Sequence, residues 1–277
     1  MRQHEEDIEE LFKAMIDRGL TSVTVNHLST ILSQALGYGI RRGYLKHNVM
    51  DIVTTPKLEI KESVFLNQVE LSRMLDACVG NRIGSFVALA IHTGMRKSEV
   101  RALRWKDLDF DRGDIYIRRA MRYVVGEQLV MGNTKTQSSK RKIELTSDNM
   151  IFAMLSGLKA KRNEQLRESS ATVQEDDLIF AYPNGDPYGE RYIENSFNEI
   201  KKKAMITKAG VGLHTLRHSY ATLMLALGED VKDVSRTLGH SKVAITYDTY
   251  SHVIAGSRRK ASSKFEESLK KSKMHTL

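Results

Sequence analysis

The sequence has few cysteines, few prolines and no long apolar run. A single cysteine, Cys78, excludes a disulfide framework and suits the reducing conditions of the cytosol. Three prolines argue against a proline-rich linker protein and are compatible with long helices. No apolar stretch approaches the roughly 18–20 residues of a membrane span, and the opening MRQHEED is too polar for a signal peptide. These absences predict a cytoplasmic protein without a membrane anchor.

The composition is that of a globular protein with an excess of positive charge. Hydrophobic residues make up 41% of the 277 residues and charged residues 28%, which is enough for a real core. Lysine and arginine together number 43, against 34 aspartates and glutamates, so the formal net charge is +9. A basic protein of this kind favours a polyanionic partner, most often nucleic acid. The length allows one large domain or two small ones.

Hydrophobic periodicity divides the chain into a helical beginning, a β-prone middle and a helical end. Apolar residues recur at helical spacing in residues 1–58, and the polar stretch 59–64 interrupts them as a linker. Short β-prone segments between residues 115 and 145 are separated by glycines, and helical patterns fill residues 190–238. We therefore expect a mainly α protein with one small antiparallel β-sheet, in the α+β class.

Helix ends are marked at three places. Asn67 followed by Glu70 is a capping-box pattern. Ser147 or Asp148 is expected to cap the long helix that follows the β-prone region. Gly239 follows an amphipathic stretch and fits the glycine that ends a helix, directly before His240.

Four segments gather arginine, lysine, histidine and tyrosine, the residue types that act on phosphate esters. None of the four is specific alone, but their order along the chain is informative. They are TGMRKSEV at 93–100, TKT at 134–136 followed by Ser139, Arg141 and Ile143, HTLRHSYAT at 214–222, and LGHS at 238–241 followed by YSH at 250–252.

In this order, the four segments resemble the tyrosine recombinase (phage integrase) family, of phage or conjugative-transposon type. The resemblance implies a catalytic domain at 65–256, preceded by part of a helical core-binding domain at 1–58 and a linker at 59–64. Residues 257–277 are then a basic C-terminal tail. The implied architecture is two lobes that close around duplex DNA.

The activity implied by the resemblance is site-specific cleavage and rejoining of DNA strands through a 3′-phosphotyrosyl intermediate and a Holliday junction. The resemblance also implies a homotetramer on DNA, with a C-terminal segment docked on a neighbouring protomer. The family's chemistry uses neither a metal nor ATP, so we expect no cofactor.

The chemistry of such a reaction accounts for each residue type. A tyrosine phenol can attack phosphorus and stay attached, and two arginines can clamp the nonbridging oxygens. A lysine can protonate the departing 5′ oxygen, while histidines can hydrogen-bond the phosphate and take the phenolic proton. The candidate catalytic residues are Arg96, Lys135, His214, Arg217, His240 and Tyr250.

The nucleophile has a neighbouring alternative. Tyr247 lies three residues before Tyr250, but the Tyr-Ser-His pattern that begins at Tyr250 matches the family. We therefore predict that Tyr250 is the nucleophile and that Tyr247 is a packing residue.

Several of these residues also have structural interpretations. Glu99 can pair with Arg96 at the i, i+3 spacing of a helix. Lys140, Arg141 and Lys142 are expected to form a basic hairpin face against the DNA backbone. A zinc site is a further alternative, although the histidines lack a compact ligand pattern. Its candidate ligands would be His214, His218, His240 and His252.

Two other functions fit parts of the sequence. The stretch from Tyr220 to Leu238, two apolar-striped helices around Gly228, resembles a helix-turn-helix of a DNA-binding protein without catalysis. A type IB topoisomerase would share the strand-cleaving chemistry. A DNA-binding protein without catalysis would form no covalent protein–DNA adduct, whereas a recombinase would form one. A type IB topoisomerase would relax plasmids that lack an attachment site, whereas a recombinase would need its site.

Overall fold

The structure is a computed structural model that describes residues 2–57, 64–122, 130–133, 140–167, 171–251 and 253. The chain divides into two compact units, Met1–Glu62 and Ser63–Leu277, and each has its own hydrophobic core. In the described part of the chain, no helix is long and apolar enough to cross a membrane.

In its described residues, 2–57, the smaller unit consists of two helices and a short 3₁₀ turn. Its core contains Phe12, Val25, Met50 and Val53. Thr21 begins the second helix, because its side-chain oxygen accepts a hydrogen bond from the backbone N–H of Thr24. The elements are α1 (Arg2–Asp17), α2 (Ser22–Arg41) and η1 (Val49–Asp51).

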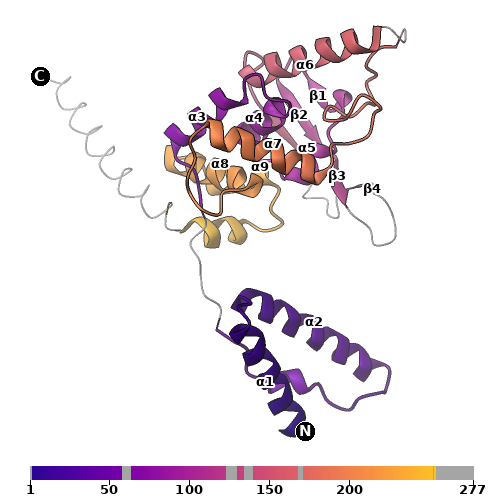
Figure 1. The fold of residues 1–277 in the computed structure, drawn as a ribbon, viewed down its shortest axis with the longest axis vertical. Coiled ribbons are helices and arrows are strands. Elements are labelled where there is room, and N and C mark those ends of the chain that lie inside the picture. The colour runs from indigo at the N-terminus through magenta and orange to yellow at the C-terminus, as the bar shows by residue number, and fades with distance from the viewer. Residues whose placement is uncertain are drawn as a thin grey trace, which may run out of the picture. The chain divides into compact units, whose positions relative to one another are not determined.

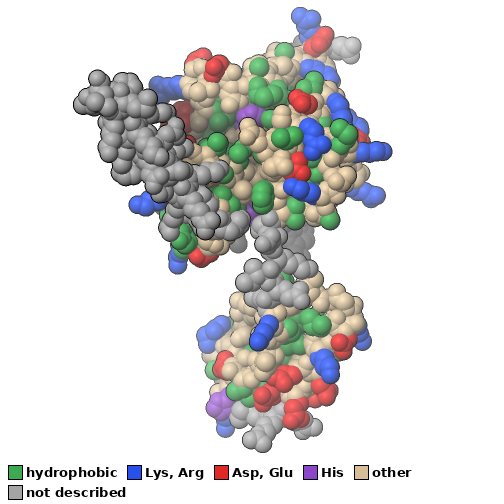
Figure 2. All heavy atoms as spheres, turned by 90° about the vertical axis from the view of Figure 1, so that its left-hand side faces the viewer, with side chains coloured by type: hydrophobic (Ala, Val, Ile, Leu, Met, Phe, Trp, Pro, Cys, Tyr) green, Lys and Arg blue, Asp and Glu red, His purple; other side chains and the backbone are tan. Residues whose placement is uncertain are grey.

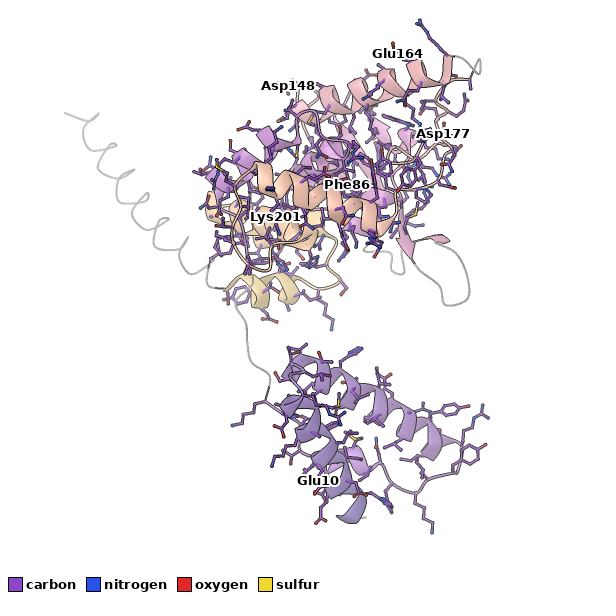
Figure 3. All side chains as sticks on the ribbon, in the orientation of Figure 1. Glu10, Phe86, Asp148, Glu164, Asp177 and Lys201 are labelled. Atoms are coloured by element: carbon purple, nitrogen blue, oxygen red, sulfur yellow. The ribbon has the colours of Figure 1, made fainter. Side chains whose placement is uncertain are left out.

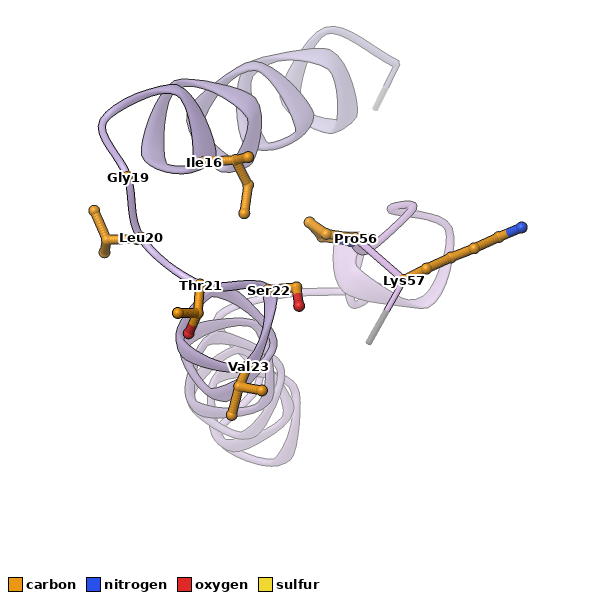
Figure 4. A pocket seen from close by; sticks show the side chains of 8 residues that line it. All are labelled: Ile16, Gly19, Leu20, Thr21, Ser22, Val23, Pro56 and Lys57. Atoms are coloured by element: carbon orange, nitrogen blue, oxygen red, sulfur yellow. The ribbon is translucent and has the colours of Figure 1, made fainter. Parts of the chain in front are cut away.

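This small core leaves apolar side chains at the surface of the smaller unit. A cavity of about 480 Å³ lies where α1 ends, α2 begins and the chain returns at Pro56. Ile16 and Pro56 flank it, whereas the side chain of Lys57 extends away (Figure 4). Val23 and Ile31 on α2 are also exposed. In Figure 2, hydrophobic side chains of this unit show between acidic and basic ones.

The larger unit surrounds a small sheet with helices (Figure 1). Its helices are α3 (Gln68–Cys78), α4 (Gly84–Thr93), α5 (Lys97–Arg101), the 3₁₀ turn η2 (Trp105–Asp107), α6 (Met150–Leu166), α7 (Glu190–Lys203), α8 (Leu213–Leu227) and α9 (Val231–Leu238). Its strands are β1 (Leu108–Asp109), β2 (Asp114–Ile117), β3 (Arg119–Arg122), β4 (Val130–Asn133) and β5 (Arg141–Glu144). A last helix begins at residue 243 and is described to residue 251.

The strands form two antiparallel groups. β1, β2 and β5 make a three-stranded sheet in that order, in which Ile115 pairs with Ile143. β3 and β4 make a separate hairpin at the edge of the unit, with Arg119 opposite Asn133. The prediction of a mainly α protein with a small antiparallel sheet is confirmed. Among the described residues, β3 pairs with β4 and not with the three-stranded sheet, so a separate hairpin accompanies the small sheet.

A large apolar cluster holds this unit together. α4 runs through its centre and is buried along most of its length, which explains its almost wholly apolar sequence. Phe86 on α4 lies in the middle of the unit and stacks edge-on with Phe180, whereas Asp148, Glu164 and Asp177 lie at its periphery (Figure 3).

A second, smaller cluster lies between α8, α9 and the last helix. It consists of Ala221, Leu225, Val234, Leu238 and Tyr250. Tyr250 is only 2% exposed, so the tyrosine predicted as nucleophile is also a packing residue.

Candidate active site

The structure brings together most of the residues that the sequence marks for phosphate chemistry. Arg96, His214, Arg217, His240 and Tyr250 all line one pocket of about 480 Å³ in the larger unit. The remaining predicted residue, Lys135, lies outside the described residues. The complete lining is Arg96, His214, Arg217, His218, Gly239, His240, Ser241, Ile245, Thr249 and Tyr250.

Gly94 shapes the turn that delivers Arg96. It ends α4 in the left-handed conformation, with φ 61°, and its N–H bonds to Ala90 O. A Cβ at this position would lie 2.6 Å from the ring of Tyr220 and 2.9 Å from Leu238. Both the backbone angle and the close approach therefore require glycine. Arg96 follows as the N-cap of α5.

A buried carboxylate holds Arg96 in place. Glu99 Oε2 accepts from the backbone N–H of Arg96 at 2.9 Å, and Oε1 accepts from Arg96 Nη1 at 3.0 Å. Arg96 Nη2 also donates to Gly239 O at 3.2 Å. Burial alone would raise the pKa of Glu99, but hydrogen bonds and charges from Arg141 and Arg96 outweigh it and lower the pKa. Glu99 is thus an anion that orients two arginines.

The second of those arginines corrects a prediction. The side chain of Arg141, expected on a basic face against DNA, is 3% exposed and donates from Nη2 to Glu99 Oε2 at 2.8 Å. Its Nε donates to Thr237 O at the end of α9. A sequence of three consecutive basic residues suggested a solvated face, but strand alternation points the middle one inward. Lys142 also has partners within the protein, because its ammonium group pairs with the carboxylates of Asp114 and Glu144. DNA would have to compete with these carboxylates for Lys142.

Arg217 is the most buried charge in the pocket lining. It is 3% exposed, and Nη1 donates to Gly94 O at 2.9 Å. Its Nη2 is buried and has no hydrogen-bond partner within the described part of the chain. Burial and the nearby Arg96 lower the pKa of Arg217 to about 9. A buried cation with an unsatisfied donor is costly unless an anion completes it.

His240 is fixed by the turn after α9. Gly239 ends α9 with φ 67°, as the sequence predicted, and a Cβ there would lie 2.7 Å from Arg141 Nη1. His240 Nδ1 shares a hydrogen bond of 2.7 Å with the hydroxyl of Thr246, which is fully buried. Burial, followed by the charges of Arg217, Arg96 and Arg141, lowers the pKa of His240 to about 4.

The two histidines of α8 lie one helical turn apart on the same face. The rings of His214 and His218 meet edge to face, with centroids 4.7 Å apart. Burial and neighbouring positive charge lower the pKa of both. His214 is the more exposed of the two. Both imidazoles are therefore neutral near pH 7.

The two tyrosines of the last helix differ in position. Tyr250 faces the pocket, and its hydroxyl lies 2.8 Å from His218 Nδ1. Burial raises the pKa of Tyr250 to about 12, although Arg217 acts in the opposite direction. Tyr247 is 44% exposed, so its prediction as a packing residue is wrong in this chain.

His218 lines the pocket, although the sequence analysis named it only as a candidate zinc ligand and left it out of the catalytic set. It stood inside the HTLRHSYAT segment, and its i, i+4 spacing from His214 was a signal that both face the same side.

For the zinc alternative, no group of three or more His, Cys, Asp or Glu side chains among the described residues is arranged to hold a metal ion. His252, one of its four candidate ligands, lies outside those residues.

Comparison with known proteins places this chain in a family. The model of the phage integrase family matches residues 64–256. A tyrosine recombinase XerC-like protein of Caldanaerobacter subterraneus subsp. tengcongensis is 29% identical over 265 residues, which cover 89% of this chain and 66% of that protein. The ICEBs1 integrase of Bacillus subtilis is 26% identical, covering 95% of this chain and 70% of that protein. The chain thus spans just under two thirds of the length of the XerC-like relative.

Solved structures show the same fold. The Tn1549 transposon integrase in complex with a circular intermediate DNA matches with a TM-score of 0.76 at 21% identity, covering 94% of this chain and 85% of that one. A lambda integrase dimer bound to a COC′ core site matches with a TM-score of 0.61 at 17% identity, covering 89% of this chain and 64% of that one. The family model matches most of the length of this chain, so the chain belongs to the phage integrase family.

Proposed function

We propose that this protein is a site-specific recombinase that cleaves and rejoins strands of duplex DNA through a 3′-phosphotyrosyl intermediate. The observation that carries the proposal is the shared pocket of Tyr250 and two arginines held by the protein, Arg96 and Arg217. A phenol beside two fixed guanidinium groups suits attack on a phosphodiester, whose charge grows on the nonbridging oxygens. Integrase relatives solved on DNA support the same substrate.

The arginines would bind the nonbridging oxygens of the scissile phosphate. Arg217 presents the buried Nη2, which has no hydrogen-bond partner among the described residues, and an anion there would supply an acceptor. Arg96 is oriented by Glu99 and by the carbonyls of Leu238 and Gly239. Because these groups are in place before substrate binds, little reorganisation is needed as the transition state forms.

The remaining predicted residues complete the reaction. His214 and His240 line the same pocket and would hydrogen-bond the phosphate as neutral donors. Tyr250 would attack phosphorus as the nucleophile. Lys135 would protonate the 5′ oxygen as it leaves, in the general-acid role that the family motif implies. No metal or cofactor takes part in this scheme.

The organisation of the whole protein follows from the same proposal. Residues 1–58 would belong to a core-binding domain that contacts DNA, 59–64 to a linker and 65–256 to the catalytic domain. Four protomers would act on two DNA sites and exchange strands through a Holliday junction. The basic tail 257–277 would dock on a neighbouring protomer. The site of action would be the cytoplasm, and the net charge of +9 supports strongly salt-dependent DNA binding.

A suicide substrate tests the proposal directly. Duplex DNA carrying the recombination site and a nick next to the scissile phosphate traps the covalent intermediate, which migrates as a protein–DNA adduct on a denaturing gel. Tyr250→Phe should bind this DNA normally and form no adduct, whereas the matched variant Tyr247→Phe should form it. Trapping by Tyr250→Phe but not by Tyr247→Phe would show that the nucleophile was wrongly chosen.

The same substrate separates the two other functions. A helix-turn-helix protein without catalysis forms no adduct, even when all its tyrosines are present. A type IB topoisomerase forms an adduct and relaxes supercoiled plasmids that lack the site. A recombinase requires the site for both cleavage and strand exchange.

A further inference from the structure

The histidine that follows Arg217 contacts the proposed nucleophile directly. His218 Nδ1 lies 2.8 Å from the hydroxyl oxygen of Tyr250, and the two ring centroids are 5.9 Å apart. We propose that His218 is a catalytic residue that accepts the phenolic proton of Tyr250 during DNA cleavage and returns it during rejoining. This inference rests on the proposed function, and it gives a residue outside the predicted catalytic set a defined role.

The surroundings of Tyr250 create the need for a proton acceptor. The side chain is 2% exposed and packs against the apolar cluster of α8 and α9. This burial raises the pKa of Tyr250 to about 12, so the phenol keeps its proton at neutral pH. A neutral phenol is a weak nucleophile, and it must lose its proton as the bond to phosphorus forms.

The surroundings of His218 suit that task. Burial, then His214, then Arg217, lower the pKa of His218, so its ring is neutral and can accept a proton. Because the phenol keeps its proton, we assign the tautomer in which Nε2 carries the hydrogen of His218 and Nδ1 accepts from the Tyr250 hydroxyl. The acceptor is therefore already in hydrogen-bond contact with the proton that it takes.

The other pocket histidines are engaged differently. His240 Nδ1 is held by Thr246 at 2.7 Å. His214 contacts His218 edge to face and lies one helical turn nearer the start of α8. Among the described residues, His218 is the histidine that shares a hydrogen bond with the Tyr250 hydroxyl. This geometry separates a proton-accepting histidine from two phosphate-binding ones.

The step balances with the groups already named. The Tyr250 oxygen forms a bond to phosphorus while the bond from phosphorus to the 5′ oxygen breaks. The phenolic proton passes to His218 Nδ1, and the 5′ oxygen takes a proton from the proposed general acid Lys135. Rejoining runs the same transfers in reverse.

Two variants of this chain distinguish proton transfer from positioning. In His218→Asn, the side-chain oxygen can stand near the place of Nδ1 and accept the hydrogen bond, but the amide cannot take the proton. His218→Ala removes both functions. If His218 is the proton acceptor, adduct formation on the suicide substrate should slow by about 10²- to 10⁴-fold in both variants, the usual range for general-base catalysis. DNA affinity and the melting temperature report separately on binding and folding.

A fluorinated tyrosine at position 250 makes the test specific. Fluorine lowers the pKa of the phenol, so less help from a base is needed. The defect of His218→Asn should shrink with fluorotyrosine, whereas the defect of the matched variant His214→Asn should not. Added imidazole should also speed adduct formation by His218→Ala in proportion to its concentration.

Each outcome decides between the claims. Wild-type speed in His218→Asn, or equal rescue of His214→Asn by fluorotyrosine, would overturn the proton-acceptor role. A His218→Asn protein that is folded and binds DNA but is slow and not rescued would also overturn it. Absence of any adduct with the wild-type chain would instead remove the proposed function.

Discussion

Arg141 and Glu99 form a buried, two-pronged ion pair, with Nη1–Oε1 at 3.0 Å and Nη2–Oε2 at 2.8 Å. Neither side chain is more than 3% exposed. Glu99 also binds Arg96, so a single carboxylate connects the start of β5 to an arginine of the pocket. The strand that follows the Lys135 segment is thereby fixed to the proposed phosphate clamp.

Removing that carboxylate should weaken both the fold and the site. Glu99→Gln leaves Arg96 and Arg141 facing an amide, and loss of one partner of a buried ion pair costs about 3–5 kcal/mol. Urea unfolding should show this loss, and adduct formation should fall because Arg96 is no longer oriented. Asp233→Asn, which breaks the exposed pair with Arg236, is the matched control and should change stability by no more than about 0.5 kcal/mol. Equal effects of the two variants would contradict this account.

Two glycines with positive φ, Gly94 at the end of α4 and Gly80 just after α3, separate backbone strain from steric overlap. Gly94→Ala should destabilise the protein by about 1–2 kcal/mol from its backbone angle. Overlap with Tyr220 and Leu238 should add about 1–3 kcal/mol. Gly80→Ala, at φ 77°, has a closer backbone angle but no atom within 4 Å of the new Cβ, so it should show only the first effect. Thermal unfolding of both variants measures the difference, and a larger cost at Gly80 would be inconsistent with the packing around Gly94.

The stability of the free protein should fall as the pH drops from 6.5 towards 4. The folded pKa of His240 is about 4, below the ordinary value of 6.5. In this window the unfolded chain binds a proton at His240 that the folded chain does not, so acid favours unfolding. The lowered pKa values of His214 and His218 act in the same direction. Unfolding free energies across the window should flatten in His240→Gln, and parallel curves for the two proteins would refute the assignment.

The role of Lys135 can be tested through the leaving group. An alkoxide needs a proton to leave, whereas a thiolate does not, since a thiol pKa is only about 8.5. Replacing the bridging 5′ oxygen with sulfur should therefore rescue cleavage by Lys135→Ala, and should do little for Arg96→Ala or Arg217→Ala. Single-turnover rates on both substrates provide the measurement. Rescue of all three variants, or of Lys140→Ala or Lys142→Ala in place of Lys135→Ala, would remove the assignment.

Local patterns in the sequence were sufficient for some features. The Asn67–Glu70 capping box forms as predicted, because its two hydrogen bonds join residues only three apart. The predicted cap of α6 was wrong. The side chain of Asn149, not of Ser147 or Asp148, accepts a hydrogen bond from the backbone N–H of Ile151. Three successive residues could all cap a helix, and the burial of Ile151 against the core decides where α6 begins.

Contacts between distant segments could not be predicted in the same way. Arg141 meets Glu99 across 42 residues, and His218 meets Tyr250 across 32. Neither spacing leaves a periodic signal, because each contact depends on how α5, β5 and the last helix pack. The motifs indicated which segments matter, while the partners of Arg141 and His218 required the folded chain.

The proposed nucleophile and Arg96 are stabilised by different parts of the core. Arg96 follows α4, the helix at the centre of the large apolar cluster, whereas Tyr250 belongs to the small cluster with Leu225, Val234 and Leu238. Opening of a segment costs less free energy when it buries less apolar surface. We therefore expect the last helix to open at a lower cost than global unfolding. Its opening would remove Tyr250 and the contact of Thr246 with His240, whereas Arg96 and Arg217 would keep their contacts with Glu99 and Gly94. We expect withdrawal of the tyrosine to be a low-energy excursion of the native ensemble, separate from global unfolding.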